Sequence, residues 1–261
     1  MIKEINKIYN EDNLITMAKM PNDFIDLIIT SPPYNKAGYE GKIRNAHKND
    51  TWKKRNIAYN DNPENDFMNE KDYKNNQIKV LNEMYRIIKP NGSIFYNHKV
   101  RIANHKASHP IEWILKSKLN FRQQIIWNRK SSPAVSPIRY LPTTELIFWL
   151  TKTNIQPNFN RKKDLLHKGE VWSFSAKPNK LHPAPFPEEL PKNIINCIKD
   201  KKNFLIYDPY AGIGTTLKVA AENGFNFIGS EIVKEYIDIA NDKILNTTRK
   251  VKLQNAQKTL F

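Results

Sequence analysis

Short apolar runs of strand length alternate along the chain with longer segments of helical periodicity. The apolar runs lie at Phe24–Ile29, Ser93–Tyr96, Ile125–Trp127, Glu145–Leu150, Phe204–Tyr207 and Asn226–Ile228. The helical patterns lie at Tyr73–Ile88, Pro191–Lys199, Thr215–Asn223 and Lys234–Leu245. Within the first pattern, apolar residues recur every three or four positions, which predicts one buried stripe. Strands that alternate with helices predict an α/β fold with a mostly parallel sheet.

Two kinds of segment interrupt this alternation. Lys89–Gly92 (KPNG) predicts the end of a helix followed by a turn, because proline and glycine stop a helix. Residues 36–72 and 154–181 are polar and basic and lack a clear period. We expect both to be surface insertions on a single domain that spans residues 1–261.

The chain carries a formal net charge of +16, from 42 Lys and Arg against 26 Asp and Glu. A charge of this size favours an anionic partner, either nucleic acid or an anionic membrane surface. No apolar run approaches the roughly 20 residues of a membrane span, which favours nucleic acid. The single cysteine, Cys197, excludes an internal disulfide and suits a reducing, cytoplasmic location.

The apolar run Phe24–Ile29 ends in the hexapeptide TSPPYN, Thr30–Asn35. Two consecutive prolines donate no backbone N–H and fix φ near about −65°, so they end the strand and stiffen the chain. Such rigidity is useful where carbonyls and side chains must be held around a ligand. An ordinary strand-ending turn is the plainer alternative.

A second motif, DPYAGIGTT at Asp208–Thr216, stands between an apolar run and a helical pattern. A strand, a glycine turn and a helix let backbone N–H groups approach a nucleotide or a carboxylate. Glu231 follows the glycines by about 20 residues at the end of the next strand, where an acidic side chain typically binds ribose hydroxyls. This spacing predicts a cofactor that contains a nucleoside.

Together the two motifs resemble those of the S-adenosylmethionine-dependent DNA amino-methyltransferases, which modify N4 of cytosine or N6 of adenine. Their order is similar to the permuted β class, with the SPPY motif first. HPAPFPEEL at His182–Leu190 and GSEI at Gly229–Ile232 resemble further segments of that family. Tyr210 departs from its usual phenylalanine. The resemblance implies a Rossmann-like methyltransferase fold in circularly permuted order, with a mostly parallel sheet and an antiparallel edge hairpin.

The same resemblance implies S-adenosyl-L-methionine as cofactor, no metal, and a set of site residues. The implied catalytic residues are Ser31, Pro32, Pro33 and Tyr34. The implied cofactor-binding residues are Asp12, Asn13, Thr30, His182, Phe186, Asp208, Pro209, Tyr210, Ala211, Gly212, Gly214, Thr215, Thr216, Glu231 and Ile232.

An exocyclic amine is a poor nucleophile because its lone pair is delocalised into the ring, and fixed acceptors around its N–H bonds favour release of that pair. The resemblance assigns this task to Ser31 and the Pro32 carbonyl, with Tyr34 stacking on a flipped base. Serine at the first position resembles the N4-cytosine enzymes, so N4 of cytosine is our first expectation and N6 of adenine the alternative. Methylation at C5 needs a cysteine nucleophile, but the surroundings of Cys197 predict a packed helix residue.

Basic and aromatic residues follow the SPPY motif directly and predict a loop that grips DNA phosphates, although a solvated basic loop is the plainer alternative. The predicted DNA-binding residues are Lys42, Arg44, Trp52, Lys53, Lys54, Arg55, Arg129, Lys130 and Arg139. The candidate target-recognition segments are residues 128–142 and 153–181.

Double-stranded DNA is the expected partner, and the resemblance also implies a homodimer and a cognate restriction endonuclease. Two alternatives stay open: a methyltransferase that acts on RNA or on protein glutamine, and a non-catalytic nucleic-acid-binding protein of the same fold. His105 and His109 stand four residues apart but lack the glutamate or cysteines of a zinc site. Asp26, inside an apolar strand, is expected to have a structural role.

Overall fold

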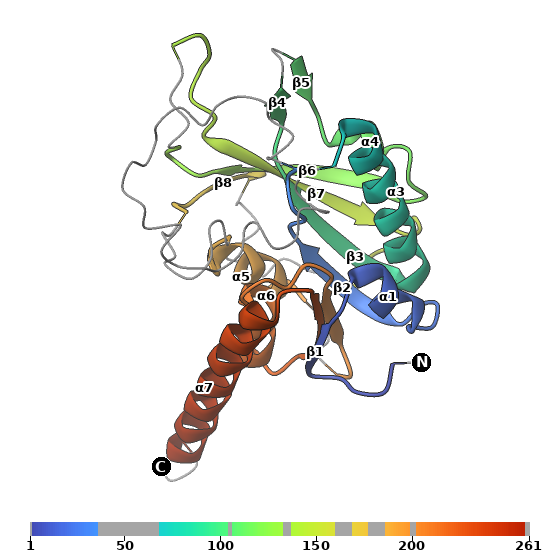
Figure 1. Cartoon of the computed structure of the whole chain (residues 1–261). Helices are drawn as coiled ribbons and strands as arrows, with labels where there is room; N and C mark the ends of the chain where they lie inside the picture. Colours follow the sequence, from blue (N-terminus) through green and yellow to red (C-terminus); the bar gives the residue numbers. More distant parts are fainter. Residues whose placement is uncertain are drawn as a thin grey trace.

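The apolar runs of the sequence form the inner strands of one sheet in a computed structural model, which describes residues 2–35, 68–103, 106–132, 137–159, 169–176, 186–198 and 202–258. Within these residues the sheet has eight strands (Figure 1). In sheet order they are β1 (Lys7–Asn10), β10 (Asn226–Glu231), β9 (Leu205–Asp208), β2 (Ile25–Thr30), β3 (Ile88–His98), β7 (Thr144–Thr151), β6 (Asn120–Asn128) and β8 (Val171–Ser173).

Neighbouring strands from β1 to β3 run parallel, and β7 then pairs antiparallel with both β3 and β6. This confirms the predicted mostly parallel sheet with an antiparallel hairpin. Beyond the hairpin, β8 adds one more strand, parallel to β6. Strand β8 lies in the segment 154–181, which was predicted to be a surface insertion outside the sheet.

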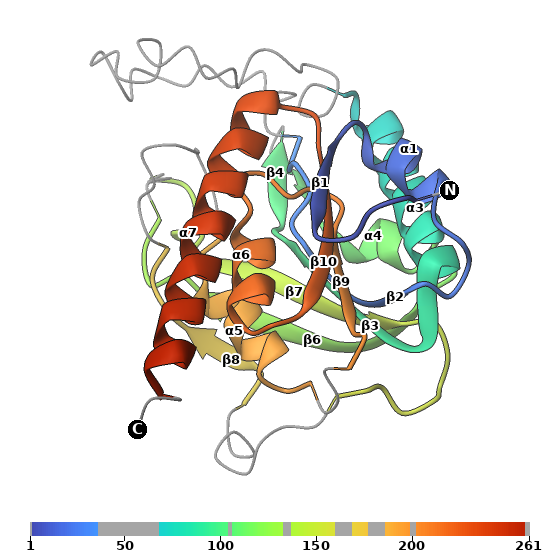
Figure 2. The same cartoon turned by 90° about the horizontal axis from the view of Figure 1, so that it is seen from below.

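Helices cover both faces of the sheet (Figure 2). One face carries α1 (Asn13–Ala18), α3 (Glu70–Ile87) and α4 (Ile111–Ile114), and the other carries α5 (Glu189–Ile195), α6 (Thr215–Glu222) and α7 (Lys234–Lys258). A hydrophobic core lies on each face of the sheet, and alternating residues of a strand pack into one core or the other. In β9, for example, Leu205 and Tyr207 pack on the α3 side and Ile206 packs on the α6 side.

The predicted turn at Lys89–Gly92 is wrong, because these residues lie inside β3. The register between β2 and β3 shifts at this point, so the extra residues form an irregularity of the strand. Lys89 Nζ lies 2.8 Å from both carboxylate oxygens of Asp26, and Asp26 also accepts the Leu205 N–H. This ion pair holds the irregular segment against β2 and confirms the structural role expected of Asp26.

The predicted helices exist, with shifted ends. Asn69 caps α3 by accepting the Asp72 N–H, so this helix begins at Glu70 and takes the last residues of the segment 36–72 that was predicted as an insertion. Residues 36–67 lie outside the described part of the chain. Cys197 is buried, as predicted, but it lies in the turn after α5 and not in the helix.

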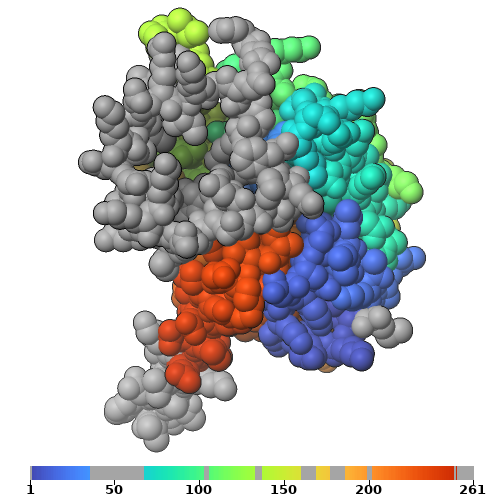
Figure 3. All heavy atoms as spheres, in the orientation of Figure 1, coloured from blue at the N-terminus to red at the C-terminus, as the bar shows by residue number. Residues whose placement is uncertain are grey.

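The strand order reverses between the parallel strands β9 and β2, because β9 connects to β10 on one side and β2 connects to β3 on the other. Strand β9 leads to α6 on one face, whereas β2 leads toward α3 on the other. In an open α/β sheet, ligands bind where such a reversal occurs, at the carboxyl ends of the strands. On the surface in Figure 3, the N-terminal segment in blue adjoins the C-terminal segment in orange, as the pairing of β1 with β10 requires.

No helix in the described part of the chain is long and apolar enough to cross a membrane.

Candidate active site

The two sequence motifs meet where the strand order reverses, between β9 and β2. Thr30, at the end of β2, donates from Oγ1 to Asp208 Oδ1 at the end of β9, at 2.9 Å. The Tyr210 N–H donates to the same oxygen at 3.1 Å. Both Thr30 and Asp208 are buried. Burial raises the pKa of Asp208 to about 6, against the effect of these hydrogen bonds, which lower it.

The glycine turn that follows Asp208 needs glycine for two separate reasons. Gly212 and Gly214 have φ of 50° and 75°, in the left-handed region. A Cβ atom on Gly214 would also lie 2.6 Å from Cβ of Ala240, so α7 leaves no space for a side chain. The turn is therefore fixed both by its own conformation and by the helix packed behind it.

Glu231 lies directly beside this turn, at the end of β10. Its Oε2 accepts the Gly212 N–H at 2.8 Å, and its Oε1 accepts the N–H groups of Ile232 and Val233. Burial raises the pKa of the Glu231 carboxyl. The glycine turn and the acidic residue predicted to bind ribose are thus adjacent in space.

The start of α1 completes this end of the sheet, because β1 pairs with β10 up to Asn10 opposite Glu231. Asp12 caps α1 by accepting the Leu14 N–H at 2.8 Å. Asn13 is buried, and its Oδ1 has no hydrogen-bond partner within the described residues. Burial raises the pKa of Tyr210, which stands where the family usually has phenylalanine, to about 12, against the effect of Asn13 and Gln77, which lower it.

A glycine turn, a buried carboxylate and an unpartnered amide oxygen at one sheet edge suit a ligand with a nucleoside and ribose hydroxyls. The remaining predicted cofactor residues in this turn or next to it are Pro209, Ala211, Thr215, Thr216 and Ile232. Phe186 packs against the core on the α6 side, before α5, whereas His182 lies outside the described residues. The described residues contain no cluster of three or more His, Cys, Asp or Glu able to hold a metal ion.

The catalytic motif continues from β2 into a buried hydrogen-bond cluster. Ser31 Oγ lies 2.9 Å from the Tyr34 hydroxyl, which donates to Glu145 Oε2 at 2.9 Å. Asn97 Nδ2 donates to the Tyr34 hydroxyl at 2.8 Å and to Glu145 Oε2 at 2.9 Å, and it lies 3.3 Å from Ser31 Oγ. Arg129 Nη1 donates to Glu145 Oε1 at 2.8 Å. Burial raises the pKa of Tyr34 well above its usual range, and the charge of Glu145 raises it further.

The loop after Ser31 is held from the α3 side as well. Tyr73 donates its hydroxyl hydrogen to the Pro33 carbonyl at 2.7 Å, so His98 Nε2, 2.8 Å away, is the donor in its contact with Tyr73. Asn35 Nδ2 donates to the Met68 carbonyl at 2.8 Å, which joins the end of this loop to the residue before the N-cap of α3. These hydrogen bonds therefore hold the loop in place.

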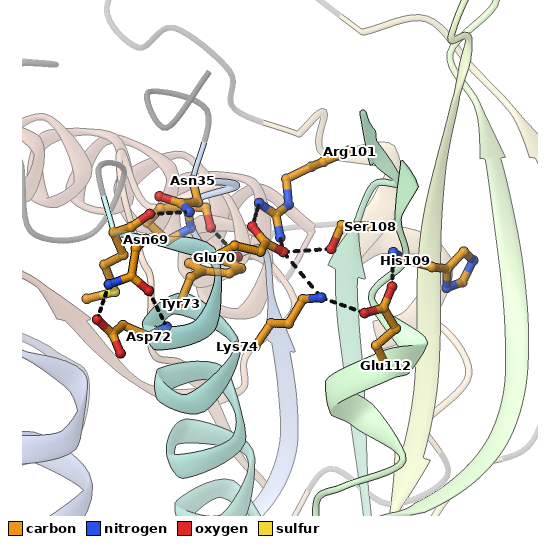
Figure 4. A network of polar contacts seen from close by, with 12 residues as sticks. Asn35, Asn69, Glu70, Asp72, Tyr73, Lys74, Arg101, Ser108, His109 and Glu112 are labelled. Atoms are coloured by element: carbon orange, nitrogen blue, oxygen red, sulfur yellow. Dashed lines mark hydrogen bonds and ion pairs between the residues drawn. The ribbon is translucent and has the colours of Figure 1, made fainter. Parts of the chain in front are cut away.

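A charged network anchors this support (Figure 4). Glu70, in the first turn of α3, accepts hydrogen bonds from both Nη atoms of Arg101, at 2.7 and 2.8 Å. It also accepts one from the Ser108 hydroxyl at 2.7 Å. Arg101 begins β4 (Arg101–Ala103), which forms a hairpin with β5 (Lys106–Ser108). The guanidinium of Arg101 also lies 4.7 Å from the centre of the Tyr73 ring. The network thus joins the hairpin, α3 and the residue that holds Pro33.

The predicted DNA-binding residues fall into two groups. Those from 42 to 55 lie outside the described residues. Arg129 faces the buried Glu145, whereas Lys130 and Arg139 are exposed on the loop between β6 and β7. Because His98 at the end of β3 pairs with Leu146, this loop lies at the same sheet edge as the catalytic motif.

Three residues of the site, Glu145, Asn97 and Tyr73, were not predicted from the sequence. One signal for Glu145 was present: a single carboxylate opens the otherwise apolar strand ELIFWL. A charge at such a position needs a buried partner or a function. Asn97 and Tyr73 carry no comparable signal, because their roles depend on tertiary pairing.

The sequence of this chain is similar to those of known DNA methyltransferases. The sequence model of the family described as DNA methylase (N6_N4_Mtase) matches residues 25–242. Type II methyltransferase M.BglII of Bacillus subtilis is 28% identical over 91% of this chain and 68% of its own length. DNA adenine methyltransferase YhdJ of Escherichia coli is 26% identical over 90% of this chain and 81% of its own length.

A solved structure supports the same fold. PvuII DNA methyltransferase (cytosine-N4-specific) superposes with a TM-score of 0.69 at 19% identity, over 95% of this chain and 93% of its own. The chain belongs to the DNA methylase family of N6-adenine and N4-cytosine amino-methyltransferases. Its cofactor is S-adenosyl-L-methionine and its substrate is DNA.

Proposed function

We propose that this protein transfers a methyl group from S-adenosylmethionine to the exocyclic N4 of a cytosine flipped out of duplex DNA. The observation that carries the proposal is the position of Ser31. It directly follows Thr30, which is hydrogen-bonded to Asp208 at the start of the glycine turn. A base held by Ser31 and a cofactor held by the turn therefore lie next to each other, as transfer between them requires.

The chain's own residues activate the amine. The Ser31 hydroxyl and the Pro32 carbonyl accept hydrogen bonds from the two N–H groups of the exocyclic amine. This favours a pyramidal nitrogen with a free lone pair. Flipping is needed because the amine cannot reach the cofactor inside a duplex. The bound cofactor supplies an electrophilic sulfonium methyl group. The amine lone pair forms the new N–C bond as the methyl–sulfur bond breaks, which leaves S-adenosylhomocysteine. The methylated amine then loses a proton to water, and this step calls for no metal and no cysteine.

N6 of adenine is the second candidate base, and the similarity to the adenine methyltransferase YhdJ supports it. Serine at position 31 supports cytosine, together with the likeness to the N4-specific PvuII enzyme. Either base presents an exocyclic amine, so the mechanism at Ser31 and Pro32 is the same for both.

The loop between β6 and β7 is our candidate for DNA contact at the catalytic edge. Arg139 is exposed at its tip between two exposed apolar side chains, Ile138 and Tyr140, which are 75% and 100% exposed. A cation flanked by an aromatic and an aliphatic side chain suits a phosphate together with unstacked bases. Lys130, at the root of the loop, is exposed as well.

Two further partners belong to the proposal. M.BglII carries the name Type II methyltransferase, and this supports a cognate restriction endonuclease that acts at the same sequence. The homodimer and the recognition segments 128–142 and 153–181 stay predictions.

Substitution at Ser31 tests the proposed site. Ser31→Ala removes the acceptor, and we expect the methylation rate on unmethylated duplex DNA to fall by a factor of about 100 or more, as for other preorganised groups. Binding of S-adenosylmethionine, measured by calorimetry, should stay within about twofold, because the turn at Gly212 and Gly214 is intact. Full activity of Ser31→Ala would refute the site.

A further inference from the structure

A serine at position 31 brings a requirement that an aspartate there would not bring. An ionised aspartate accepts hydrogen bonds in every orientation. A serine hydroxyl also carries a hydrogen, and when this hydrogen points at the amine the serine cannot accept from it. If Ser31 acts as an acceptor, as proposed above, something must direct its hydrogen elsewhere.

The buried cluster around Tyr34 contains the groups that do this. Glu145 Oε2 receives the Tyr34 hydroxyl and Asn97 Nδ2, while its Oε1 receives Arg129. Three donors aimed at one side chain require a carboxylate that only accepts. Rotating the Asn97 amide would set Oδ1 against the Glu145 oxygen, so the donor assignment of Nδ2 follows from the same carboxylate.

The hydrogens of the cluster then have one consistent arrangement. Tyr34 gives its only hydroxyl hydrogen to Glu145, at 2.9 Å. Its oxygen accepts Asn97 Nδ2 at 2.8 Å and must also be the acceptor in the 2.9 Å contact with Ser31. Ser31 is therefore the donor to Tyr34, and its hydrogen points into the protein. At 3.3 Å, Asn97 Nδ2 is its more distant neighbour, so a Ser31 lone pair is left for the substrate amine.

Burial makes this arrangement stable. Glu145 and Asn97 are only 6% and 1% exposed, and Tyr34 is 9% exposed. A hydrogen bond to a carboxylate in such surroundings is stronger than one exposed to water. The guanidinium of Arg129 compensates the buried charge from the far side.

We infer that Glu145 is a positioning residue that acts through the Tyr34 hydroxyl to hold Ser31 as a hydrogen-bond acceptor for the target amine. The inference rests on the proposed function of Ser31 and assigns Glu145, Asn97 and Arg129 to the reaction. It also gives Arg129, predicted from sequence as a DNA-binding residue, a role inside the site.

The test is a double-mutant cycle between Glu145 and Ser31. Glu145→Gln lets the side-chain amide donate, which frees the Tyr34 hydroxyl to donate to Ser31 and reverses the chain of hydrogen bonds. With a serine at position 31, we expect the methylation rate at saturating S-adenosylmethionine and DNA to fall by a factor of about 10 or more. With Ser31→Asp, whose acceptor needs no orientation, the same change should cost less than about threefold.

A second variant covers the case in which Glu145→Gln disturbs folding. Tyr34→Phe keeps the ring but removes the hydroxyl, and it should also slow the serine enzyme more than the Ser31→Asp enzyme. Calorimetric binding of S-adenosylmethionine and the thermal unfolding midpoint serve as folding controls, since no residue of the glycine turn contacts Glu145. Glu4→Gln, at an exposed glutamate that precedes β1, is the matched control and should leave the rate unchanged.

The outcomes separate this inference from the function on which it rests. An equal loss in the serine and aspartate backgrounds, for both Glu145→Gln and Tyr34→Phe, would assign the cluster a purely structural role and overturn the inference. Full activity of Ser31→Ala would overturn the proposed function itself. A loss confined to the serine background would support both.

Discussion

Thr30 and Asp208, 178 positions apart in the sequence, share a buried hydrogen bond of 2.9 Å. This contact joins the catalytic motif to the glycine turn at the point where the strand order of the sheet reverses. It explains how a chain with its catalytic motif near the N-terminus and its cofactor motif near the C-terminus forms one site. The parallel pairing of β2 with β9 brings the two strand ends together, whatever their order in the chain.

The buried carboxyl of Asp208 predicts a specific pH dependence of stability. Its pKa rises from 3.8 to about 6 on folding, so the folded state favours the protonated form. The contribution is therefore most favourable below about pH 4 and is lost as the pH rises through 6. Relative to Asp208→Asn, the wild-type free energy of unfolding should fall by about 2 kcal/mol between pH 4 and pH 7.

Urea denaturation of both proteins across this pH range measures that difference. A wild-type protein that gains stability relative to Asp208→Asn as the pH rises would contradict the assignment, because it would mean that the carboxylate is favoured by folding.

Gly214 and Gly224 form a matched pair for testing the glycine turn. Both have positive φ, of 75° and 76°, but only Gly214 faces another atom, Cβ of Ala240 at 2.6 Å. Gly224→Ala should cost about 1 kcal/mol from backbone strain alone. Gly214→Ala should cost about 3 kcal/mol, because α7 must also move. It should weaken S-adenosylmethionine binding as well, which calorimetry measures. Equal effects of the two substitutions would show that the packing of α7 does not fix the turn.

The exposed tip of the β6–β7 loop predicts a loss of DNA affinity on substitution. Arg139→Ala removes one phosphate contact, so the slope of log affinity against log salt should fall by about 1. Tyr140→Ala should weaken duplex binding by about 1 kcal/mol or more through lost stacking. Leu115→Ala is the control, since Leu115 is also exposed, at 66%, but follows α4 away from the loop. Fluorescence anisotropy with labelled duplex DNA measures all three, and equal weakening by Leu115→Ala would refute a specific role for the loop.

The six inner strands of the sheet, their alternation with helices and the motif positions could be predicted from sequence, because each is encoded within a few neighbouring residues. The outer strands β1 and β8 were not predicted. The alternation of Leu205, Ile206 and Tyr207 between two cores is one example. The extended Lys89–Gly92 segment could not be predicted in this way. Its turn-forming residues are an irregular part of β3. The ion pair that Lys89 forms with Asp26, which lies in another strand, holds them there.

The candidate site divides along the same line. Ser31, Asp208, Gly212 and Glu231 lie in motifs, and their proximity follows from the strand ends of a parallel sheet. Glu145 joins them only because β7 runs antiparallel to β3, so that its first residues reach the carboxyl end of β3. Local sequence shows only the unusual charge of Glu145 and not its role, since its partner Tyr34 is 111 positions away.

The central claim is methyl transfer to a cytosine amine, and the identity of the methylated nucleoside tests it most directly. The protein is incubated with isotopically labelled S-adenosylmethionine and unmethylated duplex DNA, and the DNA is digested to nucleosides for mass spectrometry. We predict labelled N4-methylcytosine. Labelled N6-methyladenine would contradict the assignment of the base while keeping the amine chemistry of Ser31, and labelled C5-methylcytosine would contradict the mechanism itself.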